Sequence, residues 1–162
     1  MTGEVRLRDV ELSDLPIFFE QQKEPQANRM AAIPAREQGP FTAHWRKILT
    51  DESNIIQTIT CDGRVAGNVV SFEQDGMREV GYWLGVDYWG KGIATQALTE
   101  FLKKIDARPL YGHVARHNIA SRRVLEKCGF EVIGEDESPF SPGGEPVDEY
   151  IMVLRAGEDE PG

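Results

Sequence analysis

Residues 90–95 combine small and basic side chains in a pattern that suits an anion. Gly90, Lys91, Gly92 and Ala94 follow an apolar, aromatic stretch and precede apolar residues at helical spacing. The first turn of a helix has backbone N–H groups without an internal partner, and it lies at the positive end of the helix dipole. Glycine lets the backbone turn sharply and approach a ligand oxygen closely. The pattern therefore predicts a phosphate site at the start of a helix.

The elements that must position this turn follow from hydrophobic periodicity and turn signals. Two-residue alternation and apolar runs predict seven strands, at residues 5–8, 55–60, 64–72, 79–86, 110–115, 130–133 and 150–154. Helical spacing predicts four helices. The first is capped by Ser13, the second covers 41–49 and is capped by Thr42, and the others cover 92–106 and 118–127. Asp-Gly pairs at 62–63 and 75–76 predict tight turns between three antiparallel strands that lead into the glycine turn.

The segment 23–40 breaks this regularity. It contains Pro25, Pro34, Gly39 and Pro40 and has no firm periodicity, so we predict a long loop. Loops of this length in a small domain are often functional. The segment is either a lid over the acceptor site or a plain connector.

Composition sets the class of protein. The chain has 162 residues, of which 40% are hydrophobic and 28% charged, as in ordinary globular proteins. We predict one domain over residues 1–155 and a flexible acidic tail over 156–162. The net charge of −9 argues against nonspecific nucleic-acid binding. No apolar run approaches the ~18 residues of a membrane span, and no signal-like segment is present, so a cytoplasmic location is expected. The histidines and cysteines show no metal-ligand spacing, and His113 either packs, which is the favoured interpretation, or lines the space between strands 79–86 and 110–115.

The order of elements and two motifs resemble the GNAT acetyltransferase superfamily over nearly the whole chain. The family's pyrophosphate loop, Q/R-x-x-G-x-G/A, matches residues 89–94, except that Trp89 stands in place of Gln or Arg. The second motif, NIASRRVLEKCGF from Asn118 to Phe130, is similar to the family's helix after the fifth strand. The residues of the two motifs are most similar to those of the subgroup that contains bacterial ribosomal-protein N-terminal acetyltransferases. The resemblance implies a single α/β (α+β) domain with a central mixed, mostly antiparallel, twisted sheet of about seven strands and about four helices.

The resemblance also implies where acetyl-CoA binds, in a wedge between strands 79–86 and 110–115. The pyrophosphate is expected on the glycine turn, and the pantetheine arm along the end of the first strand. Asn118 is expected near the thioester, which places it among the catalytic as well as the binding residues. Arg122 either contacts the phosphates or belongs to a solvated basic face. The implied cofactor-binding residues are Leu84, Gly85, Val86, Trp89, Gly90, Lys91, Gly92, Ile93, Ala94, Thr95, Asn118, Ser121 and Arg122.

The implied reaction is direct attack of an unprotonated amine on the thioester carbonyl. A backbone N–H within residues 84–86 is the expected donor to the developing oxyanion. Glu79 is the first candidate for the general base, acting through water, and a carboxylate paired on the sheet surface is the alternative. Many family members carry an acidic tyrosine seven residues after the motif asparagine, where this chain has Leu125. In the resembled subgroup a serine stands at the position of Ser121, so Ser121 is expected to take the place of the acid by donating a hydrogen bond to the thiolate, unless it bonds back to a helix carbonyl. Tyr150 is the reserve candidate.

Two other classes of protein share parts of this pattern. Residues 85–91 match the start of a nucleotide triphosphatase P-loop, but Gly92 stands where Ser or Thr should hold magnesium. A noncatalytic acyl-CoA sensor would keep the glycine turn and lose acetyl transfer. The sequence favours an acetyl-CoA-dependent N-acetyltransferase without a metal, whose acceptor is a small amine or a protein N-terminus. No nucleic-acid or membrane partner is expected, and a homodimer through the last two strands is left open.

Overall fold

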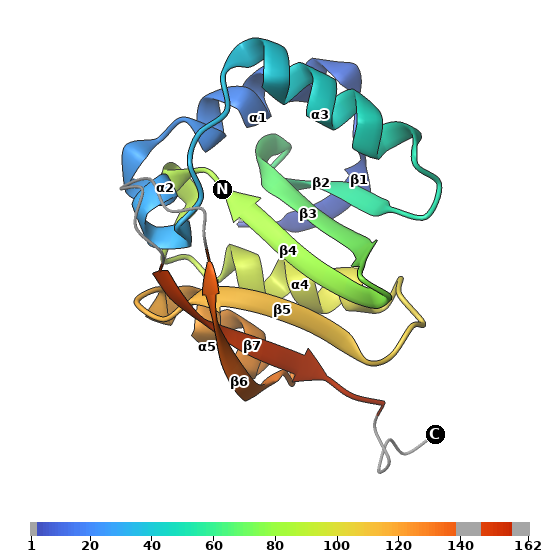
Figure 1. Cartoon of the computed structure of the whole chain (residues 1–162). Helices are drawn as coiled ribbons and strands as arrows, with labels where there is room; N and C mark the ends of the chain where they lie inside the picture. The colour runs from blue at the N-terminus through green and yellow to red at the C-terminus, as the bar shows by residue number, and fades with distance from the viewer. Residues whose placement is uncertain (1–2, 139–146, 157–162) are drawn as a thin grey trace.

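A seven-stranded sheet organises the molecule in the computed structural model, which describes residues 3–138 and 147–156. The strands lie in the order β1-β2-β3-β4-β5-β7-β6 (Figure 1). All neighbouring pairs are antiparallel except β4 and β5, which run parallel. The strands are β1 (Val5–Asp9), β2 (Ile55–Cys61), β3 (Arg64–Gln74), β4 (Met77–Leu84), β5 (Leu110–Ala115), β6 (Glu131–Ser138) and β7 (Val147–Leu154). The predicted mixed, mostly antiparallel sheet is confirmed.

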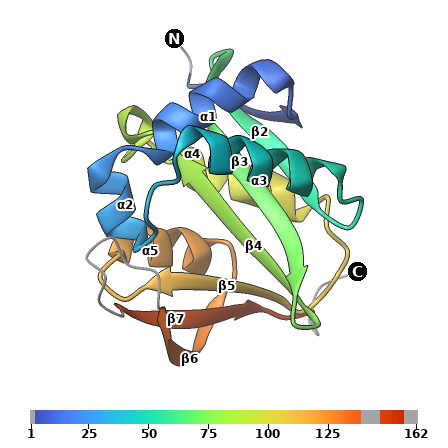
Figure 2. The same cartoon turned by 45° about the horizontal axis from the view of Figure 1, so that its top comes forward.

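Helices cover both faces of the sheet. They are α1 (Leu15–Gln22), α2 (Pro25–Ala31), α3 (Gln38–Thr50), α4 (Ile93–Leu102) and α5 (Ile119–Lys127), so the described residues form five α-helices where about four were predicted. Figures 1 and 2 show α1 and α3 over one face, α4 and α5 over the other, and α2 near the end of β5. The larger core lies under α4, where Ala97, Leu98 and Phe101 are almost fully buried by the helical spacing predicted from the sequence. A smaller aromatic core centres on Phe18 and Trp45.

The wedge predicted from the family resemblance is present in the sheet. Within the two described strands, β4 and β5 pair at one position, Glu79 opposite Tyr111, and Figure 1 shows them diverging from there. The side chains of β4 alternate between the faces. Tyr82 packs with the α4 core, whereas Trp83 points to the opposite face and donates from its indole N–H to the Gln21 carbonyl of α1 at 3.1 Å. The opening between the strands therefore connects the two faces.

The predicted loop over residues 23–40 is wrong, because it contains α2 and the first turn of α3. Pro25 is the first residue of α2, which Glu24 caps by accepting a hydrogen bond from the Gln26 amide. Pro40 lies in the first turn of α3. Proline lacks an N–H, and the first turn of a helix does not need that group, so proline starts a helix as readily as it ends one. Pro25 and Pro40, which predict a loop in the sequence, instead lie where helices start.

Several predicted boundaries also move. The cap of α3 is Glu37 rather than Thr42, and α1 follows a 3-10 turn (Leu12–Asp14) instead of beginning at a Ser13 cap. Strand β4 ends at Leu84, because Val86–Tyr88 form a second 3-10 turn. Helix α4 ends at Leu102, four residues before its predicted end. The acidic tail predicted from residue 156 lies, after Ala156, outside the described residues.

A buried carboxylate ties the first strand to the sheet. Asp14 is 2% exposed and accepts two hydrogen bonds from the Arg8 guanidinium, at 2.7 and 2.8 Å. It also accepts from the Thr58 hydroxyl at 2.7 Å and from the Glu11 amide at 2.9 Å. Burial alone raises the pKa of Asp14, but these hydrogen bonds outweigh burial and hold that pKa below its usual value.

Candidate active site

A cleft of about 610 Å³ follows the opening between β4 and β5. Its wall includes nine of the thirteen predicted cofactor-binding residues, namely Leu84, Trp89, Gly90, Gly92, Ile93, Ala94, Thr95, Asn118 and Ser121. Gly85, Val86, Lys91 and Arg122 are not among the lining residues. The glycine turn and the second motif, far apart in the sequence, therefore meet in one cleft.

The glycine turn fits a phosphate group. Gly90 and Gly92 have φ of +74° and +76°, a left-handed conformation that favours glycine. Gly92 is the N-cap of α4 and supplies no side-chain acceptor to the first turn of the helix. The helix N–H groups thus face the cleft without a protein cap, and the cationic side chains of Arg123 and Lys127 also line it. This donor set suits the pyrophosphate of a coenzyme A molecule.

Trp89, the departure from the family motif, has a structural partner. Its indole N–H donates to the Leu84 carbonyl at 3.2 Å, which ties the turn back to the end of β4. The Gly85 backbone N–H donates to the Ala66 carbonyl of β3 at 2.9 Å. Hydrogen-bonding directions alternate along an antiparallel strand, so the backbone groups of Leu84 and Tyr82 point into the wedge. The Leu84 N–H is thus the best-placed oxyanion donor of the predicted segment.

Two hydroxyl groups meet on the α4–α5 side of the cleft. Tyr82 of β4 donates from its phenol to the Ser121 hydroxyl oxygen at 3.0 Å, and both residues line the cleft. The Asn118 side chain caps α5 by accepting from the Ser121 amide at 3.2 Å, which fixes Ser121 in the first turn. Burial raises the pKa of the Tyr82 phenol, and the bond with Ser121 opposes that rise. Sequence reasoning missed Tyr82, although its position on the wedge strand marked it as a candidate.

A carboxylate–imidazole cluster lies toward the opposite side. His113 contacts Glu79 between Nε2 and Oε1 at 3.4 Å and Glu149 between Nδ1 and Oε1 at 2.9 Å. The three side chains come from β4, β5 and β7, and they are only 14% to 32% exposed. His113 and Glu149 line the cleft, whereas Glu79 lies behind the histidine and is not part of the wall. The interpretation of His113 as a packing residue is incomplete, because the structure places it between two carboxylates.

The cluster raises the pKa values of Glu79 and His113. Burial raises the pKa of Glu79, the charge of His113 opposes this rise, and Glu149 and Asp75 add to it. The hydrogen bond with Glu149 raises the pKa of His113 against an opposing effect of burial, and the charges of Glu79, Glu149 and Asp136 raise it further. Both shifts favour the proton-bound form, which is the direction that a carboxylate needs in order to act as a general base.

Helix α2 supplies an apolar wall to the same cleft. The lining residues of this segment are Ala27, Met30, Ala31 and Ile33. The helix is held in place by the buried Asn28, whose amide donates to the Gln22 and Ile33 carbonyls at 2.9 and 3.0 Å. His117 next to α5 contacts the Arg29 carbonyl at 2.7 Å. Part of the segment predicted as a lid or connector is therefore a helix that faces the cleft.

Two predicted residues lie together outside the cleft wall. The Arg122 guanidinium stacks over the Tyr150 ring at 4.8 Å, and Arg116 lies over the same ring at 5.6 Å. Arg122 also pairs with Glu126 at 3.5 Å. This placement gives Arg122 and Tyr150 a packing role, and Arg123 is the neighbouring cation that lines the cleft.

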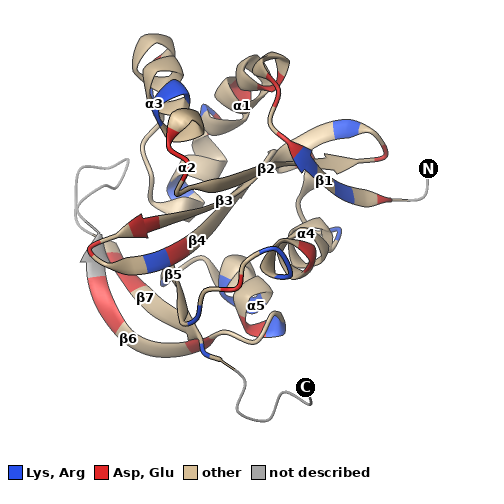
Figure 3. Ribbon diagram, turned by 90° about the vertical axis from the view of Figure 1, so that its right-hand side faces the viewer, with Lys and Arg blue, Asp and Glu red and all other residues tan. Residues whose placement is uncertain are grey.

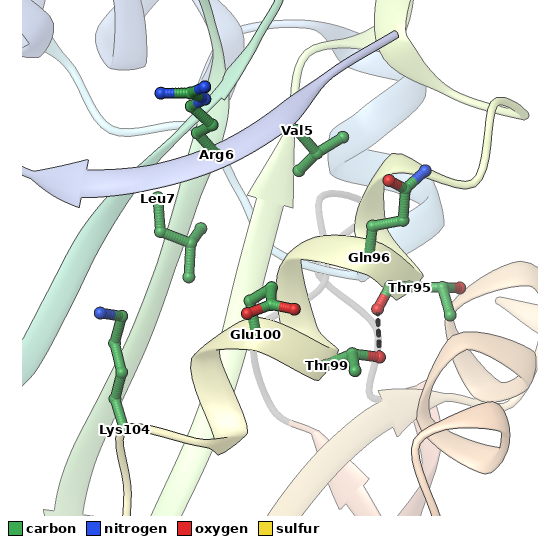
Figure 4. A pocket seen from close by; sticks show the side chains of 8 residues that line it. All are labelled: Val5, Arg6, Leu7, Thr95, Gln96, Thr99, Glu100 and Lys104. Carbon is green, nitrogen blue, oxygen red and sulfur yellow. Dashed lines mark hydrogen bonds between the residues drawn. The ribbon is translucent and has the colours of Figure 1, made fainter.

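A second hollow, of about 520 Å³, lies between β1 and α4 (Figure 4). Three of its polar side chains have local partners: Arg6 pairs with Glu4, Glu100 with Lys103, and the Thr99 hydroxyl donates to the Thr95 carbonyl at 2.7 Å. Figure 3 shows basic positions on β1 and α5 and acidic positions on β6. In residues 3–138 and 147–156, no group of three or more His, Cys, Asp or Glu side chains is arranged so that it could hold a metal ion. None of the helices in this part of the chain is long and apolar enough to cross a membrane.

The fold and cleft define an acyltransferase of the GNAT type, and comparison with known proteins identifies the family. The family model described as "Acetyltransferase (GNAT) domain" matches residues 4–131, which is most of the chain. The chain therefore belongs to the GNAT acetyltransferase family. The enzyme class expected from the sequence, an acetyl-CoA-dependent N-acyltransferase, is confirmed. No curated protein matches the sequence.

Solved structures share the fold at low sequence identity. Spermidine N-acetyltransferase from Vibrio cholerae, determined with CoA and spermine, is 20% identical, with a TM-score of 0.81 over 93% of this chain and 95% of that one. RimJ from Mycobacterium smegmatis, with CoA-disulfide, is 20% identical, with a TM-score of 0.81 over 99% and 85%. Ribosomal-protein-alanine N-acetyltransferase from Brucella melitensis is 18% identical, with a TM-score of 0.78 over 93% and 99%. The expected subgroup is represented among them.

Proposed function

We propose that this protein transfers the acetyl group of acetyl-CoA to a primary amine by direct attack within a ternary complex. The observation that carries the proposal is one cleft with two chemically different walls. The glycine turn and the hydroxyl pair lie on the α4–α5 side, whereas His113 and Glu149 lie on the opposite side. A polyanionic donor and a cationic amine can thus approach from opposite faces and meet between β4 and β5.

Deprotonation of the amine is the step that most needs a catalytic group. An alkylamine with a pKa near that of lysine is charged at pH 7, and removing its proton costs about 4–5 kcal/mol, whereas an α-amine costs about 1 kcal/mol. We propose Glu79 as the base, acting through His113: Glu149 at the cleft wall takes the amine proton and passes it to Nδ1 of the imidazole ring, while Nε2 gives its own proton to Glu79. The proton leaves the amine nitrogen for this cluster, and the nitrogen lone pair forms the new bond to the acetyl carbon.

The remaining roles belong to groups that hold or stabilise. When bound, acetyl-CoA supplies an activated acetyl group. The N-terminus of α4 holds its phosphates, and Asn118 and Ser121 face the region where its thioester is expected. The Leu84 N–H donates to the charge that develops on the carbonyl oxygen, because a fixed backbone dipole needs no reorganisation. Positioning in such a cleft can contribute roughly 7–11 kcal/mol.

The acceptor belongs to one of two classes. The apolar wall from α2 next to the His113–Glu149 pair suits an amine carried on a partly apolar group. Proteins of similar fold include acetyltransferases for spermidine and for ribosomal-protein alanine, so both small amines and protein N-termini are candidates. Tight binding of acetyl-CoA without transfer would instead indicate a sensor domain.

A mass-shift screen tests the proposal. The purified protein is incubated with acetyl-CoA and a panel of polyamines, amino acids, aminoglycosides and peptides with free α-amines. We expect addition of one acetyl group to at least one class, and loss of that product in a Gly92→Asp variant. Saturable acetyl-CoA binding without any acetylated product would contradict the proposed enzyme and support the sensor.

A further inference from the structure

The Tyr82–Ser121 pair has one proton more than its internal hydrogen bond uses. The phenol donates to the Ser121 oxygen at 3.0 Å, so the Ser121 hydroxyl proton must point elsewhere. Hydroxyl protons rotate to suit their surroundings. If the two hydroxyls exchange roles, the phenol proton becomes the one that points away. In either arrangement, the pair presents one O–H group beyond the bond that joins it.

The two residues that carry this O–H group line the cleft, and no described hydrogen bond ties it to the helix backbone. Among the described hydrogen bonds of the Ser121 hydroxyl, the partner is Tyr82 and not a carbonyl of α5. The Asn118 carbonyl, one turn before it, accepts from the Arg122 amide at 3.2 Å. Both hydroxyl-bearing residues line the cleft on the same side as the glycine turn. The expected alternative, a helix serine bonded back to a carbonyl, is not what the described residues show.

Proton affinities decide what such a pair can do for a leaving thiolate. A thiol has a pKa of about 8.5 and a phenol one of about 10. Burial raises the pKa of Tyr82 further, so transfer of the phenol proton to the thiolate is uphill. A serine hydroxyl is a still weaker acid. The pair is therefore suited to donate a hydrogen bond to a thiolate while both residues keep their protons.

We infer that Tyr82 and Ser121 act as one hydrogen-bond donor to the sulfur that leaves in the proposed reaction, with Tyr82 positioning the Ser121 hydroxyl. The inference rests on the proposed function and adds Tyr82 as a positioning residue to the donor role expected for Ser121. As the bond between the acetyl carbon and sulfur breaks, its electron pair goes to sulfur and no proton leaves the pair. The thiolate takes its proton later from solvent. The tyrosine that many family members carry at position 125 is a leucine here, and Tyr82 reaches Ser121 from β4 instead.

The thiol of bound CoA reports on this donor without any acceptor. The ultraviolet absorbance of the thiolate is titrated in the CoA complex, and the complex with desulfo-CoA provides the baseline. A hydrogen bond to the thiolate favours ionisation. We expect Tyr82→Phe and Ser121→Ala each to lower the ionisation constant of the bound thiol about tenfold, which raises its pKa by about one unit. Ser121→Thr should preserve the wild-type value.

Tyr111→Phe is the matched control, because it removes a phenol from the neighbouring strand at a residue that does not line the cleft. It should leave both the thiol titration and CoA affinity unchanged. With an acetylated amine in hand, Tyr82→Phe should lower kcat about 10- to 100-fold with little change in the KM for acetyl-CoA. The double variant with Ser121→Ala should be no worse than the more damaging single variant, because the residues act as one unit.

The outcomes separate this inference from the proposed function. An unchanged thiol titration in Tyr82→Phe, with CoA still bound, overturns the role of Tyr82. Independent, additive losses in kcat overturn the pairing. If no amine is acetylated but the thiol titration still depends on Tyr82, the donor pair stands and the proposed reaction fails.

Discussion

His113→Gln is the variant that best tests how the amine loses its proton. His113 contacts Glu79 at 3.4 Å and Glu149 at 2.9 Å, and His113 and Glu149 line the cleft whereas the half-buried Glu79 does not. Glutamine keeps a polar side chain at the position but cannot gain or lose a proton near neutral pH. If Glu79 acts through the imidazole, the variant retains its donor-binding turn and loses its base.

The expected loss follows from the size of the proton-transfer problem. General-base catalysis contributes about 10²- to 10⁴-fold. The pKa of His113 is raised, and that of Glu79 is also raised, and both shifts favour uptake of a proton by the cluster. We expect kcat/KM for an alkylamine to fall about 100-fold at pH 7. An α-amine, which is already partly neutral at pH 7, should lose less.

The pH profile carries the decisive information. Each pH unit below the pKa of the amine changes the free-amine fraction about tenfold. The deficit of His113→Gln should therefore shrink as the pH rises toward the amine pKa. Initial rates of CoA release are measured from pH 6 to 10 at saturating acetyl-CoA, for an alkylamine and for an α-amine. Glu79→Gln should show the same profile, and the double variant should lose no more than either single one.

Asp148→Asn provides the control, because Asp148 precedes Glu149 on β7, carries the same charge and pairs instead with Arg116 at 3.7 Å. It should leave the alkylamine profile unchanged. A His113→Gln enzyme within a few-fold of wild type at pH 7 would refute the relay through His113. A deficit that stays constant across pH would do the same, because it would indicate loss of packing rather than of a base.

Three further predictions concern the cleft and the fold. Gly92→Asp should weaken acetyl-CoA binding, measured by calorimetry, at least about tenfold, or 1.4 kcal/mol. Gly76→Asp is the control, because Gly76 has a similar φ of +79° but lies in a hairpin turn, and it should not weaken binding. Equal affinities in the two variants would argue against the phosphate site. Gly67→Ala should destabilise the protein by about 1–3 kcal/mol, because the added Cβ would lie 2.0 Å from a carbonyl oxygen of β4. At Gly134→Ala the added Cβ meets nothing within 4 Å, so this variant is the control. The melting temperature should fall in the first variant and not in the second. Asp14→Asn should cost about 1–3 kcal/mol at pH 7, less than a fully buried pair because its arginine partner is one-third exposed. The folded-state pKa of Asp14 is lowered, so its contribution is present above the unfolded value of 3.8 and disappears as the pH falls through the folded value. The stability difference between Asp14→Asn and wild type, measured by urea unfolding, should therefore vanish in acid; a difference that persists there would contradict this account.

The errors made from the sequence share a physical origin. Pro25 and Pro40 were interpreted as breaks, but a local pattern does not tell whether a proline ends one segment or begins a helix. The end of β4 was placed two residues late because Val86 has the composition of a strand residue, while the hydrogen bonds from Tyr88 and Trp89 back to residues 85 and 86 close a 3-10 turn. Such bonds compete with the strand only once the chain has reversed.

By itself, the sequence determined the glycine turn and the motif helix, because each depends on contacts between residues close in the chain, and it indicated the class of fold through the resemblance of its motifs and element order to a known family. Backbone conformation at Gly90 and Gly92 and the Asn118 cap are local properties. The tertiary structure alone decided which side chains meet. Tyr82 and Ser121 are 39 residues apart, and His113 and Glu149 are 36 apart, so only the divergence of β4 from β5 and the pairing of β5 with β7 bring them together. The proposed chemistry depends on these long-range pairs, and no local sequence pattern encodes them.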